Sequence, residues 1–465
     1  MLKAALRARR CAWTLGVALL VARPATAQRA AATSGAPALS IALGKSIVAL
    51  NGPWRFHTGD DPRWADPTFD DASWETVDLT PQTGAHDPDV GLTGYVGGWG
   101  ERGHRGYSGY AWYRIRVSVT APNDTRVALG GPLEVDQAYQ LFVNGRLRGG
   151  SGRFAGATPV VYNTRPAVFT LADTTATAGA APNGELLIAV RVWASDAYMR
   201  EVPTGGGIRI APTIGSLGSV TAHHRLEWLA KFLGYVVEVV EAAAFVLLAV
   251  MATSVARFQP ANRAYRWLAV ALLLTAIARA NQAIFFWTTW ESARTAILIR
   301  FVFADPLGLG AWAMAWHSWF NLERRAWLLR TIGSLTALSV LTALVAVLDL
   351  GSASQAAVSF IALLRLAFVL VTAIIIFLGV TRPAPKQWLA ITAMILVSIG
   401  LYAQEVSALG IPGIWFPYGV GVSRTQFAYA AFALVAFAML LLRLAGLARE
   451  RLAPGIRIGR HEAFD

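Results

Sequence analysis

Seven apolar segments between residues 228 and 446 constrain this chain more than any other feature. Each segment is close to the ~20 residues that an α-helix needs to cross the ~30 Å hydrocarbon core of a bilayer. Lipid offers no hydrogen-bond partners, so a single crossing segment must satisfy its own backbone as a helix. The sequence therefore predicts an all-α seven-helix transmembrane bundle, with spans at about 230–254, 265–287, 296–319, 327–349, 355–380, 387–409 and 419–444.

Basic residues are distributed unevenly among the connections between these spans. One set of loops, together with a short basic tail at 447–465, holds nearly all of them, whereas the opposite loops contribute only Arg294. The positive-inside rule places the basic set in the cytoplasm, so we expect the first span to begin outside and the C-terminus to lie inside. The set consists of Arg257, Arg263, Arg266, Arg324, Arg325, Arg330, Arg382, Lys386, Arg443, Arg449, Arg451, Arg457 and Arg460.

The N-terminus has the pattern of a secretory signal peptide at residues 1–27, followed by a linker at 28–40. A basic region from Lys3 to Arg10 precedes a short apolar stretch at 11–22 and a small-residue cleavage motif at 25–27. The alternative is an uncleaved anchor, which would give eight spans. The only cysteine, Cys11, lies in this segment, so a processed chain would have no thiol for a disulfide, a thiolate metal site or a nucleophile.

The formal net charge of +13 does not indicate nucleic-acid binding. Five of the basic residues belong to the predicted signal peptide, and most of the others flank apolar segments. A nucleic-acid interface would instead need a basic stripe interleaved with aromatic side chains. We therefore expect no nucleic-acid partner and expect the lipid bilayer to be the main surroundings of residues 228–446.

Residues 41–222 have the composition of a soluble domain and the period-two pattern of β-strands. Residues 113–119 (YRIRVSV) alternate strictly, and residues 127–129, 138–143 and 186–193 are further short apolar runs. Asn144-Gly145 follows one of these runs directly and is the strongest short hairpin signal. The sequence predicts an extracytoplasmic all-β jelly-roll sandwich.

Several spaced motifs in this region resemble the N-terminal, sugar-binding-like jelly roll of family 2 glycoside hydrolases, which has a galactose-binding-like fold. The motifs are LNGPWRF at 50–56, FDDASW at 69–74, GYAWYR at 109–114 and VDQAYQLFVNG at 135–145. In that family the catalytic carboxylates belong to a separate barrel domain, so the resemblance implies the fold and no catalytic residue here. Acidic pairs such as Asp60-Asp61 and Asp70-Asp71 have the pattern of turns, with a structural Ca²⁺ site as the alternative. We predict no metal site and no cofactor.

The segment at 84–110 is longer than a minimal sandwich needs and combines many glycines with aromatic side chains. Loops of this length are usually functional or disordered, and the aromatic content argues against disorder. One hypothesis is a ligand pocket or a docking surface, and the other is a rigid flap packed on the sandwich. The candidate ligand-binding residues are Tyr95, Trp99, Tyr107, Tyr110 and His86.

Away from the ends of the predicted spans, eight ionisable residues lie between the outer interface and about mid-bilayer. On insertion scales each costs about 2.5–3.5 kcal/mol at the centre of a lipid-facing helix, so we expect them to face the bundle interior and to pair. Four are acidic and four are basic. They are Glu238, Glu241, Arg279, Arg300, Asp305, Arg365, Glu405 and Arg424.

Two interpretations of this intramembrane polar cluster remain open. It could line a polar cavity in which ligand binding biases helix packing, or it could be a static ion-pair network that fixes the bundle. A proton or ion pathway is a third reading. It is weaker because no matching series of ionisable residues continues to the cytoplasmic side. In the third span, Pro306 with glycines at 308 and 310 predicts a kink.

As a whole, a secreted jelly roll followed by seven spans with internal charges resembles the bacterial 7TM receptors with diverse intracellular signalling modules. The resemblance implies a multi-pass protein of the bacterial cytoplasmic membrane that binds an extracytoplasmic ligand, with carbohydrate as the expected class. It also implies a cytoplasmic output such as a kinase, cyclase or phosphatase. The residues after Arg443 hold no motif of such an enzyme, and a proline and a glycine at 454–455 would interrupt a signalling helix.

Three readings of the function follow. The chain is a sensor subunit with a separate cytoplasmic partner, a truncated or split receptor, or a membrane-anchored carbohydrate-processing or transport component. The third reading would need catalytic carboxylates or a polar pathway across the full depth of the bundle, and the sequence has neither pattern. We therefore expect a receptor and not an enzyme.

Overall fold

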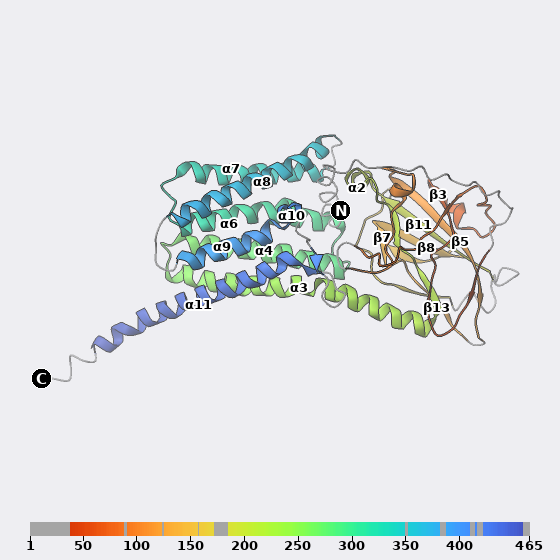
Figure 1. The fold of residues 1–465 in the computed structure, drawn as a ribbon, viewed down its shortest axis with the longest axis horizontal. Coiled ribbons are helices and arrows are strands. Elements are labelled where there is room, and N and C mark those ends of the chain that lie inside the picture. The colour runs from red at the N-terminus through yellow and green to blue at the C-terminus, as the bar shows by residue number, and fades with distance from the viewer. Residues whose placement is uncertain are drawn as a thin grey trace. The chain divides into compact units, whose positions relative to one another are not determined.

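A computed structural model describes residues 38–458 of the chain, apart from 88–90, 123–124, 157, 172–184, 349–351, 382–386, 410–413 and 416–421. The predicted signal peptide and most of the predicted linker lie outside the described residues. The chain divides into two compact units (Figure 1). Unit 1 comprises residues 1–234, 284–294 and 416–421, and unit 2 comprises 235–283, 295–415 and 422–465.

Unit 1 is built on a seven-stranded sheet in which long strands from distant parts of the chain pair. The central strands β5 (Gly109–Thr120) and β11 (Glu185–Ala194) are antiparallel, with Ile115 opposite Ile188. The order is β4-β3-β5-β11-β8-β9, and β1 pairs with the end of β5 in parallel. The other strands are β1 (Leu39–Ala42), β3 (Trp54–Thr58), β4 (Glu75–Val77), β8 (Ala138–Val143) and β9 (Arg146–Ser151).

A four-stranded sheet in the order β10-β6-β13-β2 forms the second layer, and a two-stranded ladder joins β7 and β12. One hydrophobic core lies between the sheets, with Trp54, Tyr113 and Ile188 from the larger sheet and Leu129 and Ile214 from the smaller. The unit is therefore sandwich-like. These strands are β2 (Val48–Ala49), β6 (Val127–Gly130), β7 (Glu134–Asp136), β10 (Val168–Thr170), β12 (Gly207–Ile210) and β13 (Thr213–Ser216).

The alternation in residues 113–119 decides which face of β5 meets this core. Tyr113, Ile115 and Val117 are buried in it, as the period-two pattern predicts. The hairpin prediction is also confirmed, because Asn144 and Gly145 join β8 to β9. Both residues have positive φ, +48° and +79°, which a type I′ turn requires.

Short helices connect parts of the sandwich. The 3₁₀ turns η1 (Pro62–Ala65) and η2 (Trp99–Arg102) and helix α2 (Asp196–Glu201) lie in connections. Ser195 caps α2 by accepting a hydrogen bond from the Tyr198 amide.

Unit 2 is helical. Its helices α4, α6, α7, α8, α9 and α11 run alongside one another (Figure 1), and one apolar cluster joins them through residues such as Trp312, Ile375 and Met394. The helices that follow the sandwich strands are α3 (Leu217–Phe258), α4 (Arg263–Trp287), α5 (Ala293–Ile297), α6 (Asp305–Trp319), α7 (Ala326–Val347), α8 (Ser352–Val380), α9 (Gln387–Leu401), α10 (Ala403–Ala408) and α11 (Arg424–Ile458). The start of α3 up to residue 234, the end of α4 from residue 284 and the first two residues of α5 belong to unit 1. A small ladder joins β14 (Ile414–Trp415) to β15 (Val422–Ser423).

Six helical segments among the described residues are long and apolar enough to cross a membrane. A further apolar helix, α9, has 15 residues. The predicted sixth span, 387–409, is thus divided into α9 and α10. Backbone hydrogen bonds from Tyr402 to Ser398 and from Val406 to Tyr402 continue the helical pattern across the break.

Helix α3 begins at Leu217, earlier than the apolar span predicted from residue 230. The first turns contain polar residues such as His223, Arg225 and Glu227, which lower hydropathy without preventing a helix. Ser216 accepts a hydrogen bond from the Ser219 amide and so caps the start. At the other end of the chain, α11 continues to Ile458 through the proline and glycine that were expected to interrupt a helix.

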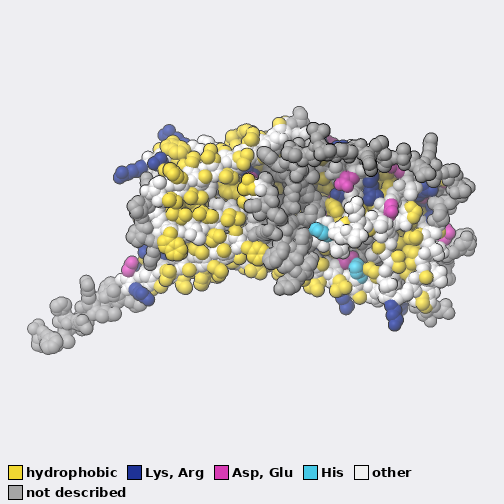
Figure 2. Space-filling model, viewed as in Figure 1, with side chains coloured by type: hydrophobic (Ala, Val, Ile, Leu, Met, Phe, Trp, Pro, Cys, Tyr) yellow, Lys and Arg dark blue, Asp and Glu magenta, His cyan; other side chains and the backbone are white. Residues whose placement is uncertain are grey.

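The predicted irregularity near Pro306 takes the form of a π-helical segment, η3 (Leu298–Ala304), directly before α6. Proline lacks an amide donor and its ring crowds the preceding turn. A widened turn removes that conflict without ending the helix. Figure 2 shows hydrophobic side chains gathered over the helical unit, with Lys and Arg at its end.

Candidate functional site

A tight charged contact within unit 2 joins Arg365 of α8 to Glu405 of α10. The guanidinium Nε lies 2.7 Å from one carboxylate oxygen and Nη2 lies 2.9 Å from the other. Nη2 also donates to the carbonyl of Leu401 at 3.0 Å. Two parallel hydrogen bonds fix both side chains in direction as well as distance. The neighbouring Tyr402 hydroxyl hydrogen-bonds Thr372 at 2.9 Å.

A second pair joins Arg279 of α4 to Glu241 of α3. The Nε···Oε2 distance is 3.5 Å, and neither carboxylate oxygen of Glu241 has a hydrogen-bond partner among the described residues. The guanidinium of Arg279 also lies 4.9 Å from the ring centroid of Tyr429 on α11, a cation–π distance. The pair is therefore held by charge and stacking more than by directed hydrogen bonds.

Two amide side chains connect a third group of charges. Glu238 accepts hydrogen bonds from Gln426 at 2.8 Å and from Gln282 at 3.5 Å. The other end of Gln282 accepts from Arg300 at 2.7 Å. Arg300 lies 3.7 Å from Asp305, and its Nε has no hydrogen-bond partner in the described part of the chain.

The structure thus gathers charges from α3, α4, η3, α6, α8 and α10 into pairs. Glu238 and Glu241 are 3% and 6% exposed, which removes the option of hydration from outside. When some groups of a buried polar network lack hydrogen bonds, fewer hydrogen bonds are broken if the network rearranges. We refer to these residues together as the polar cluster: Glu238, Glu241, Arg279, Gln282, Arg300, Asp305, Arg365, Glu405 and Gln426.

Sequence reasoning identified the charged members of this cluster. The eighth predicted charge, Arg424, has a side chain outside the described residues. The reasoning missed the two neutral members, Gln282 and Gln426, and the neighbouring tyrosines Tyr402 and Tyr429. A signal for the two glutamines existed. A polar side chain without hydrogen-bond partners is costly in lipid, so Gln282 and Gln426 inside apolar helices also need partners.

The aromatic residues of the segment at 84–110 are placed in three ways. Trp99 is 1% exposed, belongs to the sandwich core and donates from Nε1 to the Tyr107 carbonyl at 3.2 Å. Tyr95 and Tyr107 are half-buried, and His86 is exposed. Tyr95 pairs in an isolated bridge with Ile210. Most of this segment is therefore fastened to the sandwich, and Trp99 cannot contact a ligand without leaving the core.

Two tyrosines at the end of this segment adjoin a polar patch on the sheet. The Tyr107 hydroxyl donates to the Tyr110 carbonyl and accepts from the Gly59 amide. The Tyr110 ring lies 4.0 Å from the guanidinium of Arg191, which also donates to Asp60 and, at 2.8 Å, to Gln140. Burial raises the pKa of Tyr107 and of Tyr110, so both hydroxyls stay protonated.

Arg114 fastens another connection to the outer side of the seven-stranded sheet. Its side chain is fully buried and donates to Asp71 at 2.7 Å and to the backbone carbonyls of Trp64, Asp66 and Phe69. Burial alone would raise the pKa of Asp71, but hydrogen bonds from Arg114 and Arg116 outweigh it and hold the pKa below its usual value. The acidic pair at 70–71 is therefore partly a structural ion pair.

Other acids in this region cap turns. Asp61, Asp66, Asp70 and Asp78 each accept a hydrogen bond from an amide two residues later. Within the described ranges, no group of three or more His, Cys, Asp or Glu side chains is arranged to hold a metal ion. Asx-turn geometry accounts for these four acids without a cation.

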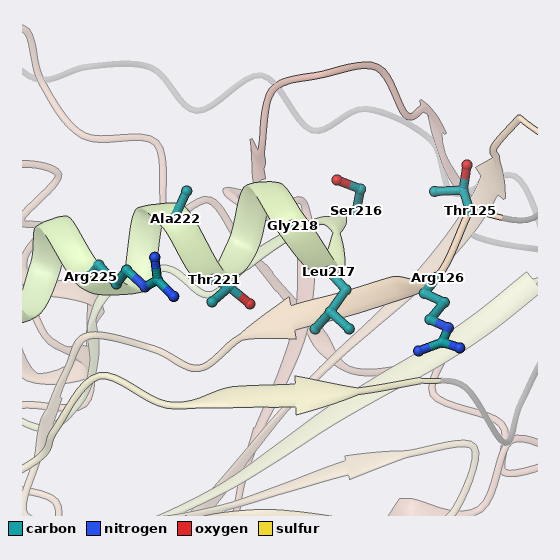
Figure 3. A pocket seen from close by; sticks show the side chains of 8 residues that line it. All are labelled: Thr125, Arg126, Ser216, Leu217, Gly218, Thr221, Ala222 and Arg225. Atoms are coloured by element: carbon teal, nitrogen blue, oxygen red, sulfur yellow. The ribbon is translucent and has the colours of Figure 1, made fainter.

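A surface pocket lies where α3 begins (Figure 3). Arg126 and Arg225 lie at opposite ends of it, and both are exposed. The helix start is already capped by Ser216. The pocket is an open surface hollow without a buried side chain in its lining, which consists of Thr125, Arg126, Ser216, Leu217, Gly218, Thr221, Ala222 and Arg225.

Comparisons with known proteins give limited information. No protein-family model matches the chain, and no curated protein does. Among solved structures, a β-glucuronidase from glycoside hydrolase family 2 is similar at 19% identity and a TM-score of 0.25, over 36% of this chain and 17% of that enzyme. A family 2 member from Bacteroides cellulosilyticus has 19% identity and a TM-score of 0.24, over 36% of this chain and 20% of that enzyme.

A Parabacteroides merdae β-glucuronidase gives 15% identity and a TM-score of 0.25, over 36% of this chain and 22% of that enzyme. This chain therefore spans about a fifth of the length of the enzymes it matches. Similarity at this level carries no argument about activity.

Proposed function

We propose that this chain is a multi-pass membrane receptor in which the sandwich binds a ligand outside the cytoplasmic membrane and the helices transmit the event inward. The observation that carries the proposal is the polar cluster. Its pairs join six helical segments, and the contacts of Glu241 and Arg300 are long and incompletely hydrogen-bonded. Such pairs can be exchanged at small cost, which allows two helix arrangements of similar energy.

The distribution of basic residues supports the direction of signalling. The connections that carry most of the arginines belong inside under the positive-inside rule. The sandwich, which precedes α3 in the chain, then lies outside. The bacterial 7TM receptors with diverse intracellular signalling modules have this order of domains, and we propose membership of that class or a relationship to it.

A carbohydrate is the ligand class that we propose. Tyr107 and Tyr110 present half-buried aromatic rings near Asp60, and the Tyr110 ring lies against Arg191, whereas Tyr95, also half-buried, lies against Arg209. Rings of this kind combine an apolar face with a polar edge, which suits a sugar. The output would pass to a cytoplasmic signalling protein, such as a kinase, cyclase or phosphatase.

The test uses the full chain in lipid nanodiscs. A thermal-shift screen against mono- and oligosaccharides identifies a ligand, and amide hydrogen exchange then follows α3, α4 and α8 with and without it. We expect ligand-induced changes in these helices in the wild type and their loss in Arg279→Ala and Arg365→Ala, with binding to the sandwich retained.

Three outcomes would count against the proposal. Ligand binding without any change in the helices would make the sandwich a binding module without transmission. Sugar hydrolysis, or sugar flux in proteoliposomes, would favour the carbohydrate-processing or transport reading. Replacing residues 90–108 by a short linker should abolish binding, and an unchanged ligand response would remove this segment from the site.

A further inference from the structure

Residues 160–165, which lie between β9 and β10 and are called here the 160–165 segment, are bonded to helical parts of unit 1. The Val161 carbonyl accepts from the Ala293 amide at 2.8 Å, at the start of α5. The Asn163 amide donates to the carbonyl of Phe286 at 3.3 Å, near the end of α4. One segment of the sandwich thus contacts both ends of the α4–α5 connection.

Lys231 of α3 adds a charged contact to the same segment. Its ammonium donates to the Thr164 carbonyl, and the residue is only 1% exposed. A buried ammonium is costly without hydrogen-bond acceptors, so this contact is not readily given up. Thr164 is itself buried, and its hydroxyl donates to the carbonyl of Val135 in β7 at 3.3 Å. The segment is therefore tied to a strand on one side and to α3 on the other.

An aromatic contact joins α3 to α4 in the same region. The rings of Phe232 on α3 and Trp287 at the end of α4 are stacked, with centroids 4.7 Å apart and an interplanar angle of 18°. The start of α3 and the end of α4 are thus joined to each other as well as to the 160–165 segment. We call this set the latch, and it consists of Val161, Asn163, Thr164, Lys231, Phe232, Phe286, Trp287 and Ala293.

The two latch helices also carry four members of the polar cluster, Glu238, Glu241, Arg279 and Gln282. On α3, Glu238 follows Lys231 by seven residues, about two helical turns along the same face. On α4, Gln282 precedes Phe286 by four residues, and Arg279 precedes it by seven. A helix transmits displacement along its axis because its backbone is rigid. Both helices therefore connect the latch to the groups whose contacts are long and incompletely hydrogen-bonded.

We propose that the latch is the coupling element of this protein: movement of the 160–165 segment shifts α3 and α4 together and thereby alters the contacts of Glu238, Glu241 and Arg279. The inference rests on the proposed receptor function for its purpose, whereas the mechanical coupling itself needs no ligand. It also explains why a lysine is buried at this position, where an apolar residue would fill the space without requiring an acceptor.

The test measures amide hydrogen exchange in the full chain in nanodiscs without any ligand. Lys231→Met keeps the side-chain length and removes the ammonium donor, and Asn163→Ala removes the contact to α4. We expect roughly tenfold faster exchange in peptides covering Glu238–Glu241 and Arg279–Gln282, because each variant loses a hydrogen bond that opposes local opening. Helix α7, which has no latch residue, should be unchanged.

Lys45→Met is the matched control, since Lys45 is exposed in unit 1 and should leave all of these peptides at wild-type rates. Faster exchange confined to the 160–165 segment, or unchanged exchange throughout, would overturn the proposal. If Lys231→Met does not fold, Asn163→Ala alone decides between these outcomes. Failure of the receptor proposal would be recognised separately, as an absent response to ligand in a chain whose ligand-free coupling is intact.

Discussion

Each of the two units buries arginine–carboxylate contacts, but the units satisfy them differently. In the sandwich, Arg114 donates to Asp71 and to three backbone carbonyls, so its guanidinium is surrounded by acceptors. In the helical unit, Glu241 and Arg279 are 3.5 Å apart, and the Glu241 oxygens lack hydrogen bonds within the described residues.

The difference is instructive because the cost of rearrangement depends on what is lost. Moving Arg114 would break several good hydrogen bonds at once, which makes it a structural fastener. Moving Arg279 would exchange one long ion pair for another, which suits a group that changes partners. Arg365 is an intermediate case, since it lies in the helical unit but forms two short hydrogen bonds to Glu405.

The largest expected effect is therefore at Arg365. Replacing it with Ala leaves Glu405 as an uncompensated charge, and we expect a loss of about 3–5 kcal/mol in unfolding free energy. Reversible unfolding in mixed micelles measures it. The double variant Arg365→Met, Glu405→Met removes both charges and should recover most of the loss. If the single and double variants were equally destabilised, the pair would matter for packing and not for charge.

A somewhat smaller loss is expected at Arg114 in the sandwich. Arg114→Met breaks its hydrogen bonds, but Asp71 keeps Arg116, 3.0 Å away, as a partner. We expect about 2–3 kcal/mol, confined to unit 1. Thermal unfolding monitored by tryptophan fluorescence gives the size, and hydrogen exchange gives the location. Faster exchange at the polar cluster would contradict the view that Arg114 stabilises only the sandwich while the polar cluster rearranges independently.

Acidification should affect the sandwich through Asp71, and less strongly than removal of Arg114 because only a charge is neutralised. The pKa of Asp71 is held below its ordinary value, so its contribution is fully present above about pH 4, the unfolded value, and is lost as pH falls through the folded pKa. Asp71→Asn should flatten the acid limb of a plot of melting temperature against pH. An unaltered acid limb would assign acid sensitivity to other carboxylates.

The smallest effect concerns the β8–β9 hairpin. Gly145 has a φ of +79° and only ordinary contacts around an added Cβ, so Gly145→Ala tests backbone strain alone. We expect a loss of about 1 kcal/mol. Gly44→Ala is the control, because Gly44 has open space around it and no positive φ, and it should be neutral. Equal melting temperatures for the two variants would show that the turn tolerates either residue.

Much of the fold was predictable because its signals are local. Periodicity located β5, β8 and β11, and Asn144-Gly145 located a hairpin. Hydropathy located the apolar helices, although it placed the start of α3 too late, since polar residues such as His223 and Glu227 are compatible with a helix. The sequence did not indicate the interruption at Tyr402, between α9 (Gln387–Leu401) and α10 (Ala403–Ala408).

The candidate site was predictable only as a set of residue types. A charge inside an apolar span must find a partner, so the sequence indicated that Glu238, Arg279 and Arg365 would lie among other polar groups. Which partner each would find was open. The structure joins Arg365 to Glu405 by two hydrogen bonds and gives Glu238 two glutamines as partners.

By itself, the sequence determined that this chain has an alternating β-region followed by apolar helices with internal charges, since those properties follow from side-chain type and spacing. Tertiary structure alone decided that Trp99 fills the sandwich core, that Lys231 is buried against Thr164, and that some charge pairs are tight while others are long. The physical reason is that burial and hydrogen-bond geometry depend on residues far apart in the chain, and only the packed structure brings those residues together.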